Sequence, residues 1–218
     1  MITTELVFVR HGQAQCNADG LVGGPRTCTG LTNLGYAQVE QAAGRLAAEH
    51  SKQPFDLVYT GPRIRLVQTG EIIGQTLQLP VSTDERLDGP IHGDADGRPW
   101  AAVKTAADGG PHAHPDQQWA AGSDTWNGYL ERASTSLRDI IDGLQGQRIL
   151  FAAHGETVIA AHTLLLDIPI GSPAGFTVDH ASITRWQQHH NRLGQTRWML
   201  DRHNDTEHLV SLAPEASS

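Results

Sequence analysis

The chain has 218 residues, of which 39% are hydrophobic and 18% charged, a composition that fits one compact domain rather than a disordered or repetitive chain. Its net charge of −8, without a run of lysine or arginine, argues against a surface for nucleic acid or an anionic membrane. No stretch approaches the roughly 20 apolar residues of a membrane span, and the amino terminus lacks a signal-peptide pattern. We therefore expect a single-domain, cytoplasmic protein over residues 1–218.

An apolar, β-branched run near the start of the chain ends in an Arg-His-Gly tripeptide. Residues 6–9 predict a buried strand, and Arg10, His11 and Gly12 follow at its carboxyl end. Open parallel sheets bind ligands in the crevice beyond the carboxyl ends of their strands. Arg10 offers a permanent charge, His11 an imidazole nucleophile, and Gly12 a backbone that an anion can approach closely. This combination points to phosphoryl chemistry.

Helix and strand signals alternate after the loop that follows this tripeptide. Apolar residues recur at helical spacing over residues 33–50, with Thr32 placed to cap the helix. Residues 56–59 predict a second strand, and residues 64–77 a helix that ends before a proline. Arg65 then projects from the first turn of that helix.

The segment over residues 89–128 differs from the rest of the chain. Glycine, proline, histidine, aspartate and tryptophan replace the regular apolar periodicity there. Long irregular segments in compact domains are often functional loops. We expect this segment to be an inserted lid rather than a second domain.

A second strand with the same ending follows the insert. After an amphipathic helix over residues 126–144, the apolar run at 149–153 ends in His154 and Gly155, and a helix is expected over residues 156–166. Chance does not readily produce two strand-His-Gly units in one chain. The repetition strengthens the interpretation of the first unit as part of an active site.

Further strands are expected at residues 177–178, 183–186 and 195–200. Strands that alternate with helices favour an α/β fold with a mostly parallel sheet and helices on both faces. The predicted fold is therefore a three-layer α/β/α sandwich with an inserted lid segment.

Together these motifs resemble the histidine phosphatase superfamily, which includes cofactor-dependent phosphoglycerate mutases and many small phosphatases. The resemblance extends nearly from end to end. The matching motifs are Arg10-His11-Gly12 with Asn17, Gly30-Leu31-Thr32 with Gly35 and Gln38, Arg65 with Gln68-Thr69, His154-Gly155, and residues 204–209.

The resemblance implies a phosphatase that hydrolyses phosphate monoesters without a metal or a cofactor. His11 would attack phosphorus and become a phosphohistidine. A phosphate monoester carries nearly two negative charges, so its transfer needs positive groups aimed at the phosphoryl oxygens. The positions implied to supply such contacts are Arg10, Arg65 and His154 as a clamp, with Gly12, Asn17 and Gly155 contributing to substrate binding.

Two of these assignments have a competing interpretation. Arg63 lies two residues before Arg65 and could be the phosphate ligand, but registering the motif on Gln68 and Thr69 favours Arg65. Asn17 could simply form a turn.

The general acid is where the chain departs from the family's pattern. The family usually has Leu-x-Glu-x-x-x-Gly, and when the flanking leucine and glycine are matched, Gly89 occupies the acid position. Asp88 could serve after a shift of one residue, or Glu85 could serve in an alternative register. His92, Glu156 or no acid at all complete the alternatives, and only geometry and pKa could decide between them.

Histidines and tryptophans gather in and near the insert. His112 and His114 lie two residues apart, but no histidine or cysteine spacing matches a zinc frame, so no metal site is expected. Trp100, Trp119 and Trp126 could line a substrate pocket or pack in a core.

The leading hypothesis is a phosphomonoester hydrolase that acts on a small phosphorylated metabolite. One alternative is a phosphoglycerate mutase-like phosphotransferase, which passes the phosphoryl group from His11 to a second hydroxyl instead of water. Another is a non-catalytic homologue that binds a phosphorylated ligand but has lost turnover because Gly89 stands at the acid position. We expect neither nucleic acid nor membrane as a partner, and an apolar edge strand could support a homodimer.

Overall fold

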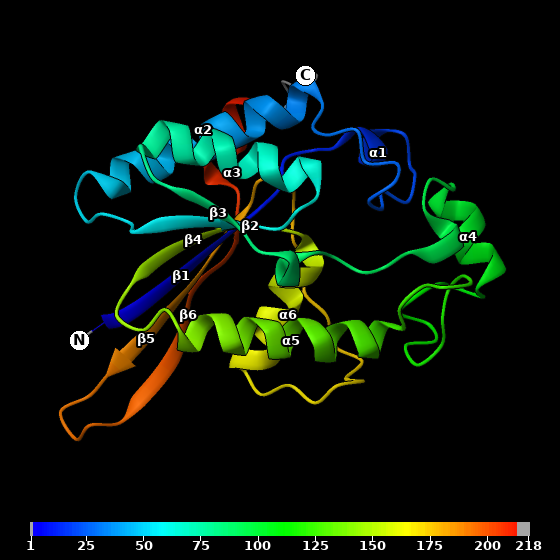
Figure 1. Cartoon of the computed structure of the whole chain (residues 1–218). Helices are drawn as coiled ribbons and strands as arrows, with labels where there is room; N and C mark the ends of the chain where they lie inside the picture. The colour runs from blue at the N-terminus through cyan, green and yellow to red at the C-terminus, as the bar shows by residue number, and fades with distance from the viewer. Residues whose placement is uncertain (1, 213–218) are drawn as a thin grey trace, which may run out of the picture.

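The computed structural model describes residues 2–212 and has a six-stranded sheet between two layers of helices (Figure 1). In chain order the strands are β1 Ile2–Arg10, β2 Leu57–Thr60, β3 Val81–Thr83, β4 Arg148–Ala153, β5 Ile183–His190 and β6 Thr196–Asp205. The helices are α1 Gln15–Ala18, α2 Asn33–His50, α3 Ile64–Leu77, α4 Trp100–Ala106, α5 Trp126–Asp142 and α6 Gly155–Leu165, with short 3₁₀ turns at Glu85–Leu87, Gly93–Ala95 and Glu207–Leu212. The predicted domain also includes residues 1 and 213–218, which lie outside the described residues.

The sheet is mostly parallel, as the sequence predicted. In the order β3-β2-β4-β1-β5-β6, the first four strands are parallel to one another, while β5 is antiparallel to both β1 and β6. A short hairpin joins β5 to β6, and such a connection permits only antiparallel pairing. The predicted strand at residues 177–178 is wrong: this segment is a loop, and the carbonyl oxygen of Val178 accepts a hydrogen bond from Arg10 instead of pairing in a sheet.

Each face of the sheet is covered by a pair of helices. Leu6 and Phe8 of β1 pack toward α5 and α6, whereas Val7 and Val9 pack toward α2 and α3. All four side chains are fully buried, which explains why β1 is a continuous apolar run and does not alternate with polar residues. Figure 1 shows the two helix pairs on opposite sides of the sheet. The three-layer sandwich predicted from the sequence is confirmed.

Of the helices that flank the site, α2 and α3 begin where the sequence predicted, and α6 begins one residue earlier than predicted. The Thr32 hydroxyl accepts a hydrogen bond from the Gly35 amide at 3.0 Å and caps α2. The first residue of α3 is Ile64, so Arg65 lies in its first turn. α6 starts at Gly155, directly after β4 and His154. The carboxyl ends of β1 and β4 and the amino ends of α3 and α6 therefore meet at one edge of the sheet.

The insert over residues 89–128 has a small core of its own. Val103 and Trp119 pack there with Ala95 and with Val22 from the loop after β1. The Asp96 carboxylate links the insert to the loop after β1, because it accepts hydrogen bonds from the Gly24 amide at 2.9 Å and the Arg26 amide at 3.0 Å. Figure 1 shows α4 apart from the two helix layers. That the insert acts as a lid stays a prediction.

Within residues 2–212, no helix combines the length and the apolar character needed to cross a bilayer.

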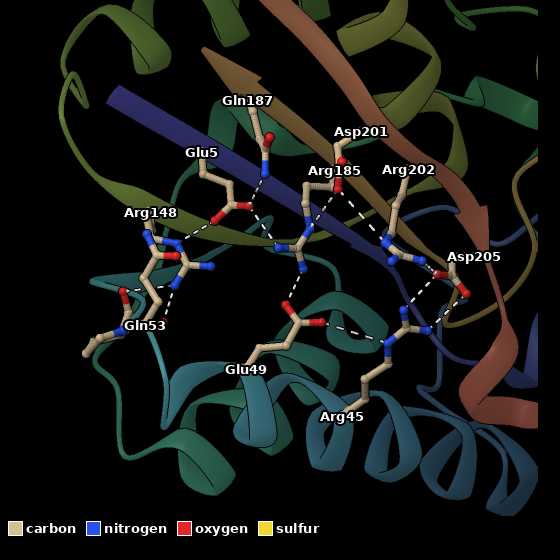
Figure 2. A network of polar contacts seen from close by, with 11 residues as sticks. Glu5, Arg45, Glu49, Gln53, Arg148, Arg185, Gln187, Asp201, Arg202 and Asp205 are labelled. Carbon is tan, nitrogen blue, oxygen red and sulfur yellow. Dashed lines mark hydrogen bonds and ion pairs between the residues drawn. The ribbon is translucent and has the colours of Figure 1, made fainter. Parts of the chain in front are cut away.

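A polar network joins the sheet to α2 (Figure 2). The Glu5 carboxylate of β1 is buried and lies between Arg148 of β4 and Arg185 of β5, with 2.8 Å from Glu5 Oε1 to Arg185 Nη1. Gln187 donates to the same oxygen at 3.2 Å. Arg185 also pairs with Glu49 of α2. Because the buried carboxylate has three donors, the chain retains an ionised group in the interior.

Replacing Glu5 with glutamine removes the negative charge that lies between two arginines. We expect Glu5→Gln to lower the free energy of unfolding by about 3 kcal/mol near neutral pH, because loss of one partner leaves buried positive charge uncompensated. Urea unfolding followed by circular dichroism measures this. The matched control is Glu40→Gln on the exposed side of α2, where a change within about 0.5 kcal/mol is expected. Equal losses in the two variants would contradict the role of Glu5.

The same carboxylate makes stability depend on pH. Burial opposes the ionisation of Glu5, but Arg185, Gln187 and Arg148 outweigh it and lower the pKa. A lowered folded-state pKa gives stability that is fully present above the ordinary carboxyl pKa and is lost as the pH falls through the folded value. The wild type and Glu5→Gln should therefore converge in stability under acid conditions.

Candidate active site

His11 lies at the carboxyl end of β1, with its side chain buried beneath the surface. Its amide continues the ladder to β4 by donating to the Ala153 carbonyl at 2.9 Å. Its ring Nδ1 lies 2.7 Å from the Gly12 carbonyl oxygen. Because a carbonyl oxygen can only accept, Nδ1 carries the proton and Nε2 keeps its lone pair. The nitrogen available as a nucleophile is thus Nε2.

Arg65 joins the two histidines of the strand-His-Gly units. Its Nε donates to His11 Nε2 at 3.2 Å, and its Nη2 lies 3.3 Å from His154 Nδ1. Its Nη1 donates to the Gly23 carbonyl at 2.9 Å. The side chain is buried, so the planar fork is held by three acceptors on three different segments.

His154 presents one ring nitrogen to the site without a hydrogen bond. Arg65 donates to Nδ1, so the proton of the neutral ring lies on Nε2. That nitrogen is buried and lacks a hydrogen-bond partner among the described residues; the nearest carboxylate atom, Asp88 Oδ1, is 3.6 Å away. The rings of His11 and His154 meet edge to face, with 5.5 Å between centroids. A phosphoryl oxygen would satisfy this unpaired N–H.

Arg63 contacts the loop that contains Gly89, the residue that the sequence comparison places at the family's acid position. Its Nε lies 2.7 Å from Asp88 Oδ1, and its Nη2 donates to the Pro90 carbonyl at 2.6 Å. Its Nη1 donates to the Gly23 carbonyl at 3.2 Å. Arg63 therefore positions residues 88–90 against the site, whereas Arg65 contacts the histidines. This arrangement supports the choice of Arg65 over Arg63 as the arginine beside His11.

Arg10, the last residue of β1, lies beside the amino end of α6. Its guanidinium donates to the Val178 carbonyl and to His180 Nε2, the latter at 3.2 Å. Its Nε is buried without a hydrogen-bond partner among the described residues, close to the amino end of α6 at Gly155. The His180 ring lies 5.8 Å from that of His11, so this histidine also borders the site. Sequence reasoning missed His180 because it stands in an irregular loop with no motif around it.

The two central histidines are held neutral. Burial lowers the pKa of His11 well below its ordinary value, and Arg65, His154 and Arg10 lower it further. Burial, Arg65 and Arg63 act in the same direction on the pKa of His154. Both effects follow from placing an imidazole in a dry site among positive charges. The site thus keeps a neutral nucleophile while its net charge attracts an anion.

The glycine after His11 serves the packing of the loop. A Cβ at Gly12 would stand 2.2 Å from the Gly35 carbonyl oxygen and 2.9 Å from Val39 Cγ2, so any other residue would push α2 away.

The exposed Asn17 side chain accepts a hydrogen bond from the Ala14 amide at 3.0 Å and caps α1. The substrate-binding roles given to Gly12, Asn17 and Gly155 stay predictions.

Gly89 packs directly against His154. A Cβ at this position would lie 2.8 Å from His154 Cδ2, so the space of an acid side chain is filled by the ring. Of the two proposed substitutes, Asp88 faces the site, with Oδ1 between Arg63 and His154. Glu85 lies exposed on its 3₁₀ turn.

His92 and Glu156, the other two candidates for the general acid, lie near the arginines of the site. Burial is the main cause that lowers the pKa of His92 to about 4, and Arg63 adds to it. Glu156 is in the first turn of α6, and although burial disfavours its charge, the local backbone and Arg10 lower its pKa. Glu156 is therefore ionised, which makes it a charge in the site rather than a proton donor.

A scan against protein families matches residues 6–206 to the histidine phosphatase superfamily (branch 1). The chain belongs to this superfamily. The resemblance drawn from the motifs is thereby confirmed. The matched range includes the two strand-His-Gly units, the Arg65 segment and the first residues of the tail.

Relatives of the chain include several phosphatases. It is 29% identical to the putative phosphoserine phosphatase 2 of Hydrogenobacter thermophilus over 186 residues, which is 82% of this chain and 87% of the relative. It is 29% identical to the glucosyl-3-phosphoglycerate phosphatase of Mycolicibacterium vanbaalenii over 217 residues, 92% of this chain and 94% of the relative. These relationships support histidine-phosphatase activity, as predicted, although mutases such as that of Rhodococcus opacus also match at 27% identity.

Solved structures confirm the fold. The mycobacterial glucosyl-3-phosphoglycerate phosphatase complexed with VO3 superposes with a TM-score of 0.77 at 24% identity, over 92% of this chain and 99% of that one. A phosphoserine phosphatase from Entamoeba histolytica in complex with 3-phosphoglyceric acid gives a TM-score of 0.72 at 22% identity, over 95% and 100% of the two chains. Structural neighbours of the chain thus include proteins that bind phosphorylated small molecules.

The tautomer and charge of His11 can be measured directly. We expect the ¹⁵N shifts of the His11 imidazole to remain those of a neutral ring with the proton on Nδ1 through the pH range in which the unfolded chain titrates, because burial, Arg65, His154 and Arg10 lower its pKa. Comparison with His11→Ala assigns the signals, and the urea-unfolded chain should titrate at about 6.5. A ring that protonates in the folded protein near the unfolded value would contradict the assignment.

Proposed function

We propose that the chain hydrolyses phosphate monoesters through a phosphohistidine on His11 Nε2. The observation that supports this most strongly is the lone pair of that nitrogen, which the Gly12 carbonyl fixes by holding the proton at Nδ1 and which faces Arg65, an arginine that also contacts His154. A nucleophile with a preorganised cluster of donors is the arrangement that phosphoryl transfer requires.

The reaction takes place in two displacements. In the first, the Nε2 lone pair forms a bond to phosphorus while the bond to the leaving oxygen breaks, and that oxygen takes up a proton. In the second, water attacks phosphorus, the P–N bond breaks, and the imidazole recovers its lone pair as inorganic phosphate leaves. Arg65, Arg10 and His154 stabilise the phosphoryl oxygens in both steps.

Asp88 is the group best placed to donate the proton to the leaving oxygen. Its carboxylate is 25% exposed and lies 3.6 Å from His154 Nε2, so it borders both the site and solvent. Glu85 lies on an exposed turn and forms no hydrogen bond to the histidines or arginines of the site among the described contacts. The proposed role of Asp88 depends on its facing the phosphoryl group once the substrate is bound.

A small phosphorylated metabolite remains the proposed substrate, and a cytoplasmic location and a possible homodimer remain part of the proposal. The net charge of −8 leaves no broad basic surface for nucleic acid or for an anionic membrane. Positive charge is instead supplied locally in the site by Arg10 and by the buried Arg63 and Arg65. Function without a metal is likewise proposed.

The first test measures release of p-nitrophenol from p-nitrophenyl phosphate in the presence of EDTA. We expect turnover that falls at least about 10³-fold in His11→Ala, since the nucleophile is lost. His189→Ala, on β5 and remote from the site, is the control and should keep activity. Wild type mixed rapidly with substrate and quenched in alkali should also carry a phosphoryl group that alkali preserves and acid removes.

The alternatives predict different outcomes of this experiment. A mutase-like enzyme would form the phosphohistidine but would turn over slowly in water. A second alcohol would then speed release of p-nitrophenol, because the alcohol takes the phosphoryl group and becomes a phosphate ester. A binding protein would accumulate phosphohistidine without release, or would bind phosphate and form none. Full activity in His11→Ala would refute the mechanism altogether.

The general acid is tested by varying the leaving group. We expect Asp88→Asn to lower kcat/KM about 10²-fold for butyl phosphate, whose alkoxide must be protonated, and far less for p-nitrophenyl phosphate, whose phenolate leaves unaided. Glu85→Gln serves as the matched carboxylate control and should leave both substrates near wild type. The reverse pattern would assign the acid to Glu85, and equal loss on both substrates would assign Asp88 a positioning role through Arg63.

A further inference from the structure

Two adjoining pockets open beside the site. The smaller, of about 170 Å³, reaches Arg10, Gly155 and Glu156. The larger, of about 530 Å³, lies between the amino end of α5, the outer side of α6 and the loop over residues 168–177. Both are lined by His112, Trp126, Ile159 and Phe176, so these four side chains form one continuous wall that leads away from Arg10.

We propose that this pair of pockets binds the leaving group of the substrate, and that this group is apolar and uncharged, such as an aryl or alkyl chain. The inference rests on the proposed function, because it takes the phosphoryl group to lie at His11 and Arg10. It adds the chemical class of the remainder of the molecule.

The shared wall is mainly aromatic. The His112 ring packs edge to face on Trp126, with 4.3 Å between centroids. Phe176 packs on His162 of α6 at the same centroid separation, 4.3 Å. Aromatic side chains fixed by such contacts give a large apolar surface at low cost in conformational entropy. A flat or extended apolar group fits such walls best.

The charges around the pockets argue against an anionic leaving group. Among the described residues that line the two pockets, Arg10 is the only arginine or lysine. The phosphoryl group would pair with its charge. Glu156 stands at the junction and adds a negative charge where the leaving group begins. A carboxylate on the substrate would therefore meet Glu156 without a positive partner. Substrates such as phosphoserine or 3-phosphoglycerate carry this carboxylate.

Three aryl phosphates of similar leaving-group acidity separate binding from reactivity. They are phenyl phosphate, 4-butylphenyl phosphate and 4-(3-carboxypropyl)phenyl phosphate. We expect kcat/KM for the butyl compound to exceed that for phenyl phosphate about tenfold or more, because added methylenes enter an apolar pocket. The carboxypropyl compound, similar in shape, should fall at least about tenfold below the butyl compound.

Variants assign the effect to the proposed walls. Phe176→Ala, on the loop, should reduce the preference for butylphenyl over phenyl phosphate several-fold, and Trp126→Ala should do the same from α5. Glu156→Gln should narrow the gap between the carboxypropyl and butyl compounds. Leu193→Ala, 84% exposed on the β5–β6 hairpin, is the control and should leave both ratios unchanged. Circular dichroism verifies that each variant is folded.

A binding measurement makes the two proposals fail separately. Calorimetry with His11→Ala compares the affinity of phenyl and 4-butylphenyl phosphate without turnover. If the wild type hydrolyses none of the compounds while His11→Ala binds the butyl compound more tightly, the pocket proposal is supported and the proposed function is contradicted. If the wild type hydrolyses all three compounds at equal kcat/KM, or if Phe176→Ala and Trp126→Ala leave the preference unchanged, the pocket proposal is overturned.

Discussion

The site depends on one buried guanidinium. Arg65 contacts His11, His154 and the Gly23 carbonyl, so a single side chain sets the orientation of both imidazoles and the position of the loop after β1. Its charge also contributes to keeping both rings neutral. The rest of the architecture serves this contact: α3 begins at Ile64, and parallel β1 and β4 place the two histidines at the same edge of the sheet.

Much of this arrangement could be predicted from local sequence. The bounds of α2 and α3 follow from apolar periodicity and a cap at Thr32, and the two His-Gly units mark the carboxyl ends of neighbouring strands. What could not be predicted depends on contacts between distant segments. The loop at residues 177–178 contains residues typical of strands, yet its carbonyl group binds Arg10, and β3 is a three-residue edge strand too short for a periodic signal.

The roles of the two arginines before α3 show the same limit. Spacing alone placed Arg63 and Arg65 near the site but could not show that they divide the work. Only the folded chain reveals that Arg63 binds Asp88 and Pro90, and so fixes the loop that bears the unusual Gly89. Gly89 in turn leaves room for the His154 ring, because a Cβ at this position would lie 2.8 Å from His154 Cδ2.

The separate core of the insert has a consequence for how this protein moves and varies. Val22, Ala95, Val103 and Trp119 form a cluster apart from the two cores that flank the sheet. A segment with its own small core can open as a local unit without unfolding the sheet. Substitutions in this cluster and in the two sheet cores should also change stability nearly additively, because distant sites contribute nearly independently. The insert can therefore vary without a matching change in the cores that hold the sheet.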